Sequence, residues 1–144
     1  FMPTIKDLLR TKNRKLITVS SSSSIIDALR IMAEANIGCL IVLDGDHYVG
    51  MFAERDYARK IVLEGRSSDS TTVNEIMVSD IPMLNSTDSI ELCSTIMTEK
   101  TLRYLPVFEN SQLVNLISQS DIIKYTIDTQ KSLIAHLQDY MNLK

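Results

Sequence analysis

The feature that most constrains the fold is an internal repeat, in which residues 17–56 align without a gap with residues 82–121. Ten of the 40 aligned pairs are identical, and one of them is the pair Asp56 and Asp121, whereas a typical composition gives roughly two or three identities by chance. Two copies are too few for an open solenoid, which needs about three repeats or more. The repeat therefore predicts two related halves, each of which buries the apolar face of the other.

Each copy predicts the same order of elements, β-α-β-β-α. The apolar run "CLIVLD" is typical of a buried strand, the turn "DGD" leads into a returning strand, and Ser24 and Asp27 have the spacing of a capping box at a helix start. In the first copy we expect strands at 16–20, 39–44 and 47–53, a helix from Ser24, and a helix at 54–64 that ends before Gly65. In the second copy we expect a helix that starts at an Asp88–Glu91 capping box, strands at 104–109 and 113–118, and a helix at 119–128.

Two features complicate this pattern. Pro106 falls within a strand-like run, and because proline lacks a backbone N–H it favours an edge strand or an irregular position. A further helix, expected at 130–143, has an apolar face that needs something to pack on. Outside the copies lie short amphipathic pieces at 4–9 and 72–77 and a polar linker at 65–72. We expect a first repeat with its N-terminal helix at 1–65, a second repeat at 66–128 and a C-terminal helix at 129–144.

The composition is that of a globular chain and argues against several classes of partner. Hydrophobic residues make up 44% and charged residues 23%, with a net charge of −3, so no basic field favours nucleic acid or an anionic membrane. The longest apolar runs are about five residues, against the roughly 20 that a spanning helix needs, and the N-terminus lacks the pattern of a signal peptide. We expect a cytoplasmic protein.

The residues that could support catalysis or hold a metal do not form a recognisable set. Cys39 and Cys93 lie in apolar patterns, where core packing is the default for cysteine, and no His is placed to activate either. His47 and His136 are isolated, without a second ligand at metal spacing. No P-loop, GxGxxG or GxSxG motif occurs in the sequence. We therefore expect a protein that is not an enzyme, has no catalytic cofactor and binds no metal.

The cores of the two copies, "IGCLIVLDGDHYVGMFAERD" and "LRYLPVFENSQLVNLISQSD", each end in Asp after a hairpin. In this order, spacing and terminal Asp, the chain resembles a tandem pair of CBS (cystathionine β-synthase) domains, known as a Bateman module. The resemblance covers about residues 4–127, with no catalytic domain expected beside it. It implies an α/β (α+β) fold in which two pseudo-twofold repeats pack through their sheets, with an extra terminal helix.

The resemblance also implies an adenosyl ligand, such as AMP, ADP, ATP, NADH or S-adenosylmethionine, in clefts between the repeats. The family's motif is Gly-apolar-apolar-Ser/Thr-x-x-Asp. An ionised Asp in the first turn of a helix can accept hydrogen bonds from both ribose hydroxyls, and the helix N-terminus presents free N–H groups to phosphate. Apolar strand residues would enclose the adenine.

The second copy matches the motif at Ser118 and Asp121, with Ser120 beside the Asp. It departs from the motif at Asn115, where the family has a Gly that lets a ligand or backbone approach closely. Asn115 therefore predicts a narrower or reshaped end of the cleft. Because both hydroxyls are present, the resemblance favours the Asp121 site over the one in the first copy.

The first copy matches the motif at Gly50 and Asp56. It has Ala53 in the hydroxyl position, which removes one phosphate contact, and Arg55 in place of Ser120, which could offer phosphate a longer-reaching partner. By the family's geometry, each cleft borrows walls from both repeats. The walls expected for the Asp121 site are Ile17, Ile37 and Gly38, with Arg103 at the phosphates and Lys12 and Arg14 as secondary contacts; those for the Asp56 site are Ile81, Met83, Leu102 and Arg103.

A ligand is not the only reason to place an acid here, because an Asp in the first turn stabilises a helix by about 0.3–1 kcal/mol on its own. Two functions therefore stay open. In the first, the chain senses adenine nucleotides, and so energy or redox state, and modulates a partner protein. In the second, the clefts are vestigial and the chain is a ligand-independent dimerisation or scaffold module. In both we expect a homodimer through the helices at 54–64 and 119–128, with the face of 130–143 as extra surface.

Overall fold

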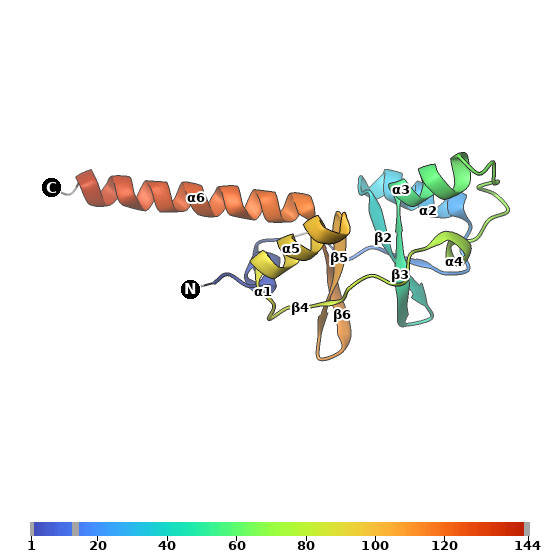
Figure 1. The fold of residues 1–144 in the computed structure, drawn as a ribbon, viewed down its shortest axis with the longest axis horizontal. Helices are drawn as coiled ribbons and strands as arrows, with labels where there is room; N and C mark the ends of the chain where they lie inside the picture. Colours follow the sequence, from blue (N-terminus) through green and yellow to red (C-terminus); the bar gives the residue numbers. More distant parts are fainter. Residues whose placement is uncertain (1, 13–14, 143–144) are drawn as a thin grey trace. The chain divides into compact units, whose positions relative to one another are not determined.

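The fold is that of a computed structural model, which describes residues 2–12 and 15–142. Its element order follows the predicted repeat (Figure 1). The first copy forms β1 (Thr18–Ser20), α2 (Ile25–Ala35), β2 (Cys39–Asp44), β3 (His47–Ala53) and α3 (Glu54–Tyr57), and the second forms β4 (Leu84–Asn85), α5 (Ile90–Lys100), β5 (Tyr104–Glu109), β6 (Gln112–Ser118) and α6 (Gln119–Asn142). The remaining elements are α1 (Ile5–Thr11), the π-helical segment η1 (Ala58–Val62) and α4 (Val73–Ile76).

Each copy contains a three-stranded sheet of the same topology. The strand orders are β1-β2-β3 and β4-β5-β6, with the first two strands of each sheet parallel and the last two antiparallel. Leu40 opposite Phe52 and Leu105 opposite Ile117 are equivalent pairs in the two hairpins, and all four side chains are fully buried. The predicted α/β fold with two β-α-β-β-α repeats is confirmed.

The chain forms two compact units. We call Lys15–Pro82 the Asp56 unit, and α1 together with the segment that begins at Met83 the Asp121 unit. Apolar side chains from all three strands of the Asp56 unit and from α2, η1 and α4 share one core. The buried members of that core are Val19, Ile25, Ala28, Met32, Leu40, Val42, Phe52, Ile61, Val73 and Ile76.

The short helix that precedes each copy packs on the other copy. In the Asp121 unit, the backbone N–H of Ile5 in α1 donates to the carbonyl of Asp88 at 2.9 Å. In the Asp56 unit, the N–H of Val73 in α4 donates to the carbonyl of Ser23 at 2.9 Å. Each unit is therefore built from one copy and the short helix that comes before the other copy. The division of the chain into a first repeat at 1–65, a second at 66–128 and a C-terminal helix at 129–144 stays a prediction.

The edge position predicted for Pro106 is wrong, because β5 is the central strand of its sheet. β4 begins at Leu84, which pairs with Val107, whereas β1 begins one position earlier, with Thr18 paired to Ile41. Ile41 is the equivalent of Pro106 in the repeat. β4 is thus shorter than β1 by one residue, the residue that would pair with Pro106. The N–H that proline lacks is therefore not needed for the parallel pairing of β4 with β5.

The start of α5 also differs from the prediction. Its N-cap is Ser89, whose Oγ accepts the backbone N–H of Leu92 at 3.0 Å, and not Asp88. Ser24 caps α2 in the equivalent way, with the N–H of Asp27 at 3.2 Å. The repeat itself, which aligns the two serines, was the better guide to this cap than the spacing of the acids.

The later helices differ in continuity. The helix expected at 54–64 is α3 followed by the π-helical segment η1, in which the N–H of Leu63 reaches back five residues to the carbonyl of Ala58 at 3.2 Å. The two helices expected at 119–128 and 130–143 form one continuous helix, α6, of 24 residues. No glycine or proline interrupts this stretch of sequence, so nothing ends the helix between them.

Candidate functional site

Asp121 lies in the first turn of α6, directly after β6. Its Oδ2 accepts the backbone N–H of Ser118 at 2.8 Å, and its own N–H donates to Oγ of Ser118 at 3.0 Å. The N–H of Gln119 donates to the carbonyl of Arg103 at 2.8 Å, which ties the start of α6 to the residue before β5. These three bonds fix the direction of the Asp121 carboxylate relative to the sheet.

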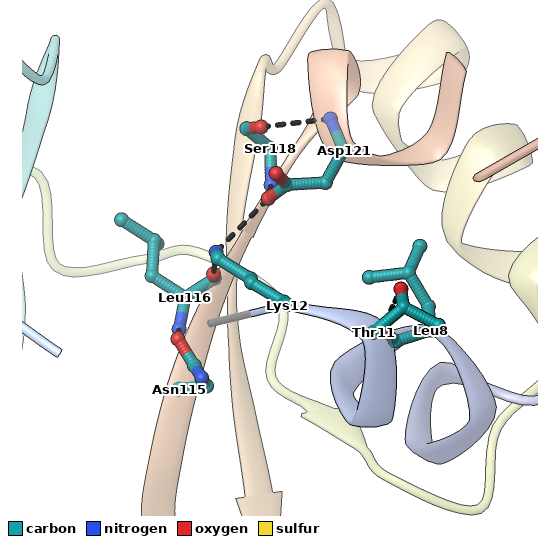
Figure 2. A network of polar contacts seen from close by, with 7 residues as sticks. All are labelled: Leu8, Thr11, Lys12, Asn115, Leu116, Ser118 and Asp121. Atoms are coloured by element: carbon teal, nitrogen blue, oxygen red, sulfur yellow. Dashed lines mark hydrogen bonds and ion pairs between the residues drawn. The ribbon is translucent and has the colours of Figure 1, made fainter. Parts of the chain in front are cut away.

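A lysine from the end of α1 reaches this carboxylate (Figure 2). Lys12 Nζ donates to Oδ2 of Asp121 at 2.9 Å and also to the carbonyl of Leu116 in β6. The side chain of Lys12 is only 12% exposed and that of Asp121 23%. The ion pair is therefore sheltered from water on most sides, and Lys12 places a fixed positive charge beside the expected ribose-binding group.

The surroundings of Asp121 decide its charge. Burial acts to raise the pKa of this carboxyl, but the N–H of Ser118 and the ammonium of Lys12 outweigh burial and hold the pKa below its ordinary value. Asp121 is therefore ionised at neutral pH, which is the form that can accept hydrogen bonds from a diol.

Asp56 in the Asp56 unit occupies the equivalent place at the start of α3. Its Oδ2 accepts the backbone N–H of Ala53 at 2.9 Å, and Oδ1 lies 3.6 Å from Nζ of Lys60, one turn further along. The same ammonium donates to the carbonyl of Ile76 at 3.0 Å. Asp56 is buried, with 8% of its surface exposed. Each unit therefore pairs its aspartate with a lysine, but the two lysines come from different elements.

The sequence did not predict the two lysines that pair with the aspartates, Lys60 with Asp56 and Lys12 with Asp121. A signal for Lys60 is present, since it lies four residues after Asp56, a spacing at which opposite charges meet on a helix. No local signal points to the pairing of Lys12 with Asp121, because 109 positions separate them. Lys12 was expected to contact phosphate, and the structure shows it bound to the carboxylate itself.

The difference between Gly50 and Asn115 has a structural cause within each unit. In the Asp56 unit, Met51 next to Gly50 exchanges two backbone hydrogen bonds with Val78, both of 2.9 Å. A Cβ on Gly50 would lie 2.7 Å from the carbonyl oxygen of Val78, so this close approach requires glycine.

In the Asp121 unit, the equivalent backbone N–H and carbonyl, those of Leu116, form hydrogen bonds with side chains and not with a second backbone segment. The N–H of Leu116, the equivalent of Met51, donates to Oδ1 of Asn115 at 2.8 Å, and its carbonyl accepts from Lys12. Asn115 therefore provides the hydrogen-bond acceptor for a backbone N–H of β6. At the equivalent position of the other unit, Gly50 leaves room for the backbone at Val78 to supply that acceptor. Its effect on a ligand stays a prediction.

The other expected contacts differ in exposure. Ser120, Arg55 and Arg103 are exposed, and Ala53 is half-buried at the end of β3. Leu102 is half-buried, while Met83 is 64% exposed. Arg14 lies outside the described residues.

The apolar walls expected for the two sites are divided between the units. Ile17 and Ile37 pack against the core of the Asp56 unit, and the carbonyl of Gly38 accepts the N–H of Glu54 at 3.0 Å, as that of Arg103 does for Gln119. Ile81, half-buried, also belongs to the Asp56 unit. The roles of Ile17, Ile37 and Gly38 toward a ligand at Asp121, and of Ile81 toward a ligand at Asp56, stay predictions.

The remaining reactive groups serve packing. Burial raises the pKa of the Cys93 thiol to about 12 and raises the pKa of Cys39 as well, and both are buried, as the sequence predicted.

Among residues 2–12 and 15–142, no three His, Cys, Asp or Glu side chains gather in a way that could hold a metal ion. Within the same residues, no helix has the length and apolar content needed to cross a bilayer.

Comparisons with known proteins agree with the repeat. The family model described as "CBS domain" matches residues 4–63 and 73–128. A solved structure of a protein with CBS domains from Burkholderia ambifaria is 41% identical, with a TM-score of 0.85 over 88% of this chain and 96% of that one. One from Agrobacterium tumefaciens is 28% identical, with a TM-score of 0.79 over 85% and 98%. The mitochondrial CBS domain-containing protein CBSX3 of Arabidopsis thaliana is 26% identical over 96% of this chain and 71% of its own.

Proposed function

Because the chain belongs to the CBS domain family, with two such domains in tandem, we propose that it is a regulatory module that binds an adenosyl ligand. The ligand would be AMP, ADP, ATP or NAD(H), and its binding would modulate a partner protein in response to energy or redox state. Members of the family are in general non-catalytic regulatory modules. A ligand of this kind acts by favouring one conformation or assembly of the module over another.

The observation that carries the proposal is the ion pair between Lys12 and Asp121 at the start of α6. The ionised carboxylate supplies acceptors for a ribose diol. The Lys12 ammonium and the N-terminal N–H groups of α6 supply positive charge for the adjoining phosphate. A ligand that carries a diol and a phosphate a few ångströms apart could therefore place its diol against the carboxylate and its phosphate against the positive charge.

We propose the Asp121 site as the principal one. Ser118 and Ser120 add hydroxyl groups at the start of α6, whereas Ala53 offers none at the start of α3. Asp56 is also more deeply buried than Asp121, so a ligand has less access to it. The Asp56 site would then bind more weakly or prefer a different ligand.

Thermal unfolding with AMP, ATP and NADH tests the proposal. Ligand at about 100 times its dissociation constant should add about 2.7 kcal/mol to the free energy of unfolding. The increase should disappear in Asp121→Ala and persist in Asp128→Ala, which removes an exposed acid from the same helix. An increase that survives Asp121→Ala and is lost in Asp56→Ala would assign the ligand to the other copy.

A second function is favoured by a specific observation: both carboxylates already have partners in their own unit. Asp121 binds Ser118 and Lys12, and Asp56 binds Ala53 and lies against Lys60. These contacts stabilise helix starts without any ligand. The chain would then be a ligand-independent dimerisation or scaffold module, and no adenosyl compound would raise its stability.

In either case we propose a homodimer through α3 with η1 and the first turns of α6, in the cytoplasm. Val62 and Leu63, which are 56% and 79% exposed, offer apolar surface for such an interface. The oligomeric mass by light scattering, with and without nucleotide, tests this assembly independently of binding.

A further inference from the structure

The second half of α6 carries large apolar side chains that stay exposed in the described chain. Every residue from Thr126 to Asn142 is exposed, and α6 continues past α1 and α5 of its own unit (Figure 1). The large exposed apolar residues of α6 are Ile123, Ile127, Leu133, Ile134, Leu137, Tyr140 and Met141, each between 46% and 70% exposed. Such a concentration of apolar surface on a water-facing helix indicates an interface.

The spacing of these residues is that of a coiled coil. Six positions, 123, 127, 130, 134, 137 and 141, alternate steps of four and three residues, which is the 3.5-residue period of an a/d seam. Five of the six are Ile, Leu or Met, and the sixth is Gln130. We call these six positions the α6 seam.

The α6 seam points away from the body of its own unit. The inward side of α6 is marked by Ile122, which is buried, and Tyr125, which is half-buried. Since each residue advances by about 100° around a helix, the centre of the seam lies about 130° from that inward side. The seam is therefore available to another molecule along its whole length.

We propose that the α6 seam pairs with the α6 seam of a second copy of this chain, as a parallel two-stranded coil. A helix with a 3.5-residue seam is complementary to another of the same period, because the side chains of each fit the gaps of the other. The proposal does not depend on nucleotide binding.

The available area agrees with a dimer interface. The five apolar side chains of the α6 seam, each exposed by roughly half or more, supply about 400 Å² of apolar surface per chain. Interfaces are only about 57% apolar, so the polar and apolar area buried on each chain would together be about 700 Å². This is close to the roughly 800 Å² per partner of a standard interface.

The charges favour a copy of the chain over a membrane, and a parallel pair over an antiparallel one. From Thr126 to Asn142 the helix has Asp128 and Asp139 but only Lys131, whereas helices that lie on anionic membranes are rich in Lys and Arg. An antiparallel pair would bring Lys131 of the two copies together at its centre. A parallel pair avoids this repulsion and places Gln130 against the same residue of the second copy, where one polar layer fixes the register.

Disulfide trapping tests the proposal on the full chain, since Cys39 and Cys93 are buried and cannot cross-link the native protein. Gln130→Cys should give a covalent dimer on mild oxidation, seen on a non-reducing gel. Ser132→Cys, on the opposite side of the helix, should give little. In the Gln130→Cys background, Ile134→Asp should lower the yield at least about tenfold, and Ser132→Asp should leave it unchanged.

Equal yields from Gln130→Cys and Ser132→Cys, or a yield that Ile134→Asp does not lower, would overturn the pairing. A mixture of Gln130→Cys and Ile134→Cys chains that cross-links only between the two variants would show an antiparallel pair and refute the parallel arrangement. Since the trapping is done without nucleotide, its failure is distinguishable from a failure of the proposed ligand site, which the thermal measurements report.

Discussion

Replacing Gly50 by alanine tests whether this glycine serves the fold or only a ligand. The added Cβ would lie 2.7 Å from the carbonyl oxygen of Val78 and 3.3 Å from Sδ of Met77. The methionine can turn away at small cost, but the Val78 oxygen belongs to the backbone and cannot. The segment at Val78 must therefore move off β3, and the two 2.9 Å hydrogen bonds between Met51 and Val78 lengthen or break.

The expected cost follows from those two bonds. A backbone hydrogen bond contributes about 0.5–1.5 kcal/mol net, so losing two lowers the free energy of unfolding by about 1–3 kcal/mol. Overpacking of the same junction acts in the same direction and is of similar size. We expect Gly50→Ala to destabilise the unliganded protein by about 2 kcal/mol, a value well outside the scatter of surface substitutions.

Urea denaturation followed by far-ultraviolet circular dichroism measures this cost, since the chain has no tryptophan. The comparison variant is Asn115→Ala at the equivalent position, which adds no clash and removes only the acceptor of the Leu116 N–H. We expect it to cost about 1 kcal/mol. A Gly50→Ala protein as stable as the wild type, with only its nucleotide affinity reduced, would refute the packing argument and assign the glycine to ligand approach.

Three further results are expected from the charged and buried groups. Lys12→Met should lower the free energy of unfolding by about 1–3 kcal/mol, because the Asp121 carboxylate and the Leu116 carbonyl each lose a donor. Urea titration at neutral pH measures this loss, and an unchanged unfolding midpoint would contradict the prediction. Because the folded pKa of Asp121 is lowered, its contribution to stability is complete above its ordinary pKa near 4 and is lost as the pH falls below that value. Asp121→Asn should therefore be less stable than wild type at pH 7 and approach it at pH 3. Burial keeps the thiols of Cys39 and Cys93 protonated, so alkylation at pH 8 should modify neither until urea unfolds the chain, and rapid labelling of the native protein would show that they are accessible.

The repeat predicted more of the fold than any local signal did. Alignment of Ser24 with Ser89 gives both helix caps, whereas the acidic spacing alone placed the second cap one residue early, at Asp88. The strand-breaking character of Pro106 was read as an edge position, because one sequence does not show that the neighbouring strand can be shortened instead. β4 makes that adjustment, by starting at Leu84, and the proline stays in the centre of the sheet.

The sequence by itself determined the repeat, the order of its elements, and the placement of one aspartate after each hairpin, because these depend on periodicity and on residues close together in the chain. Only the tertiary structure decided which short helix packs on which copy, and so which lysine meets which carboxylate. Lys12 reaches Asp121 across 109 positions, while Lys60 reaches Asp56 within one helical turn. The physical reason is that an ion pair requires two groups within a few ångströms, and distant segments come that close only when the chain folds.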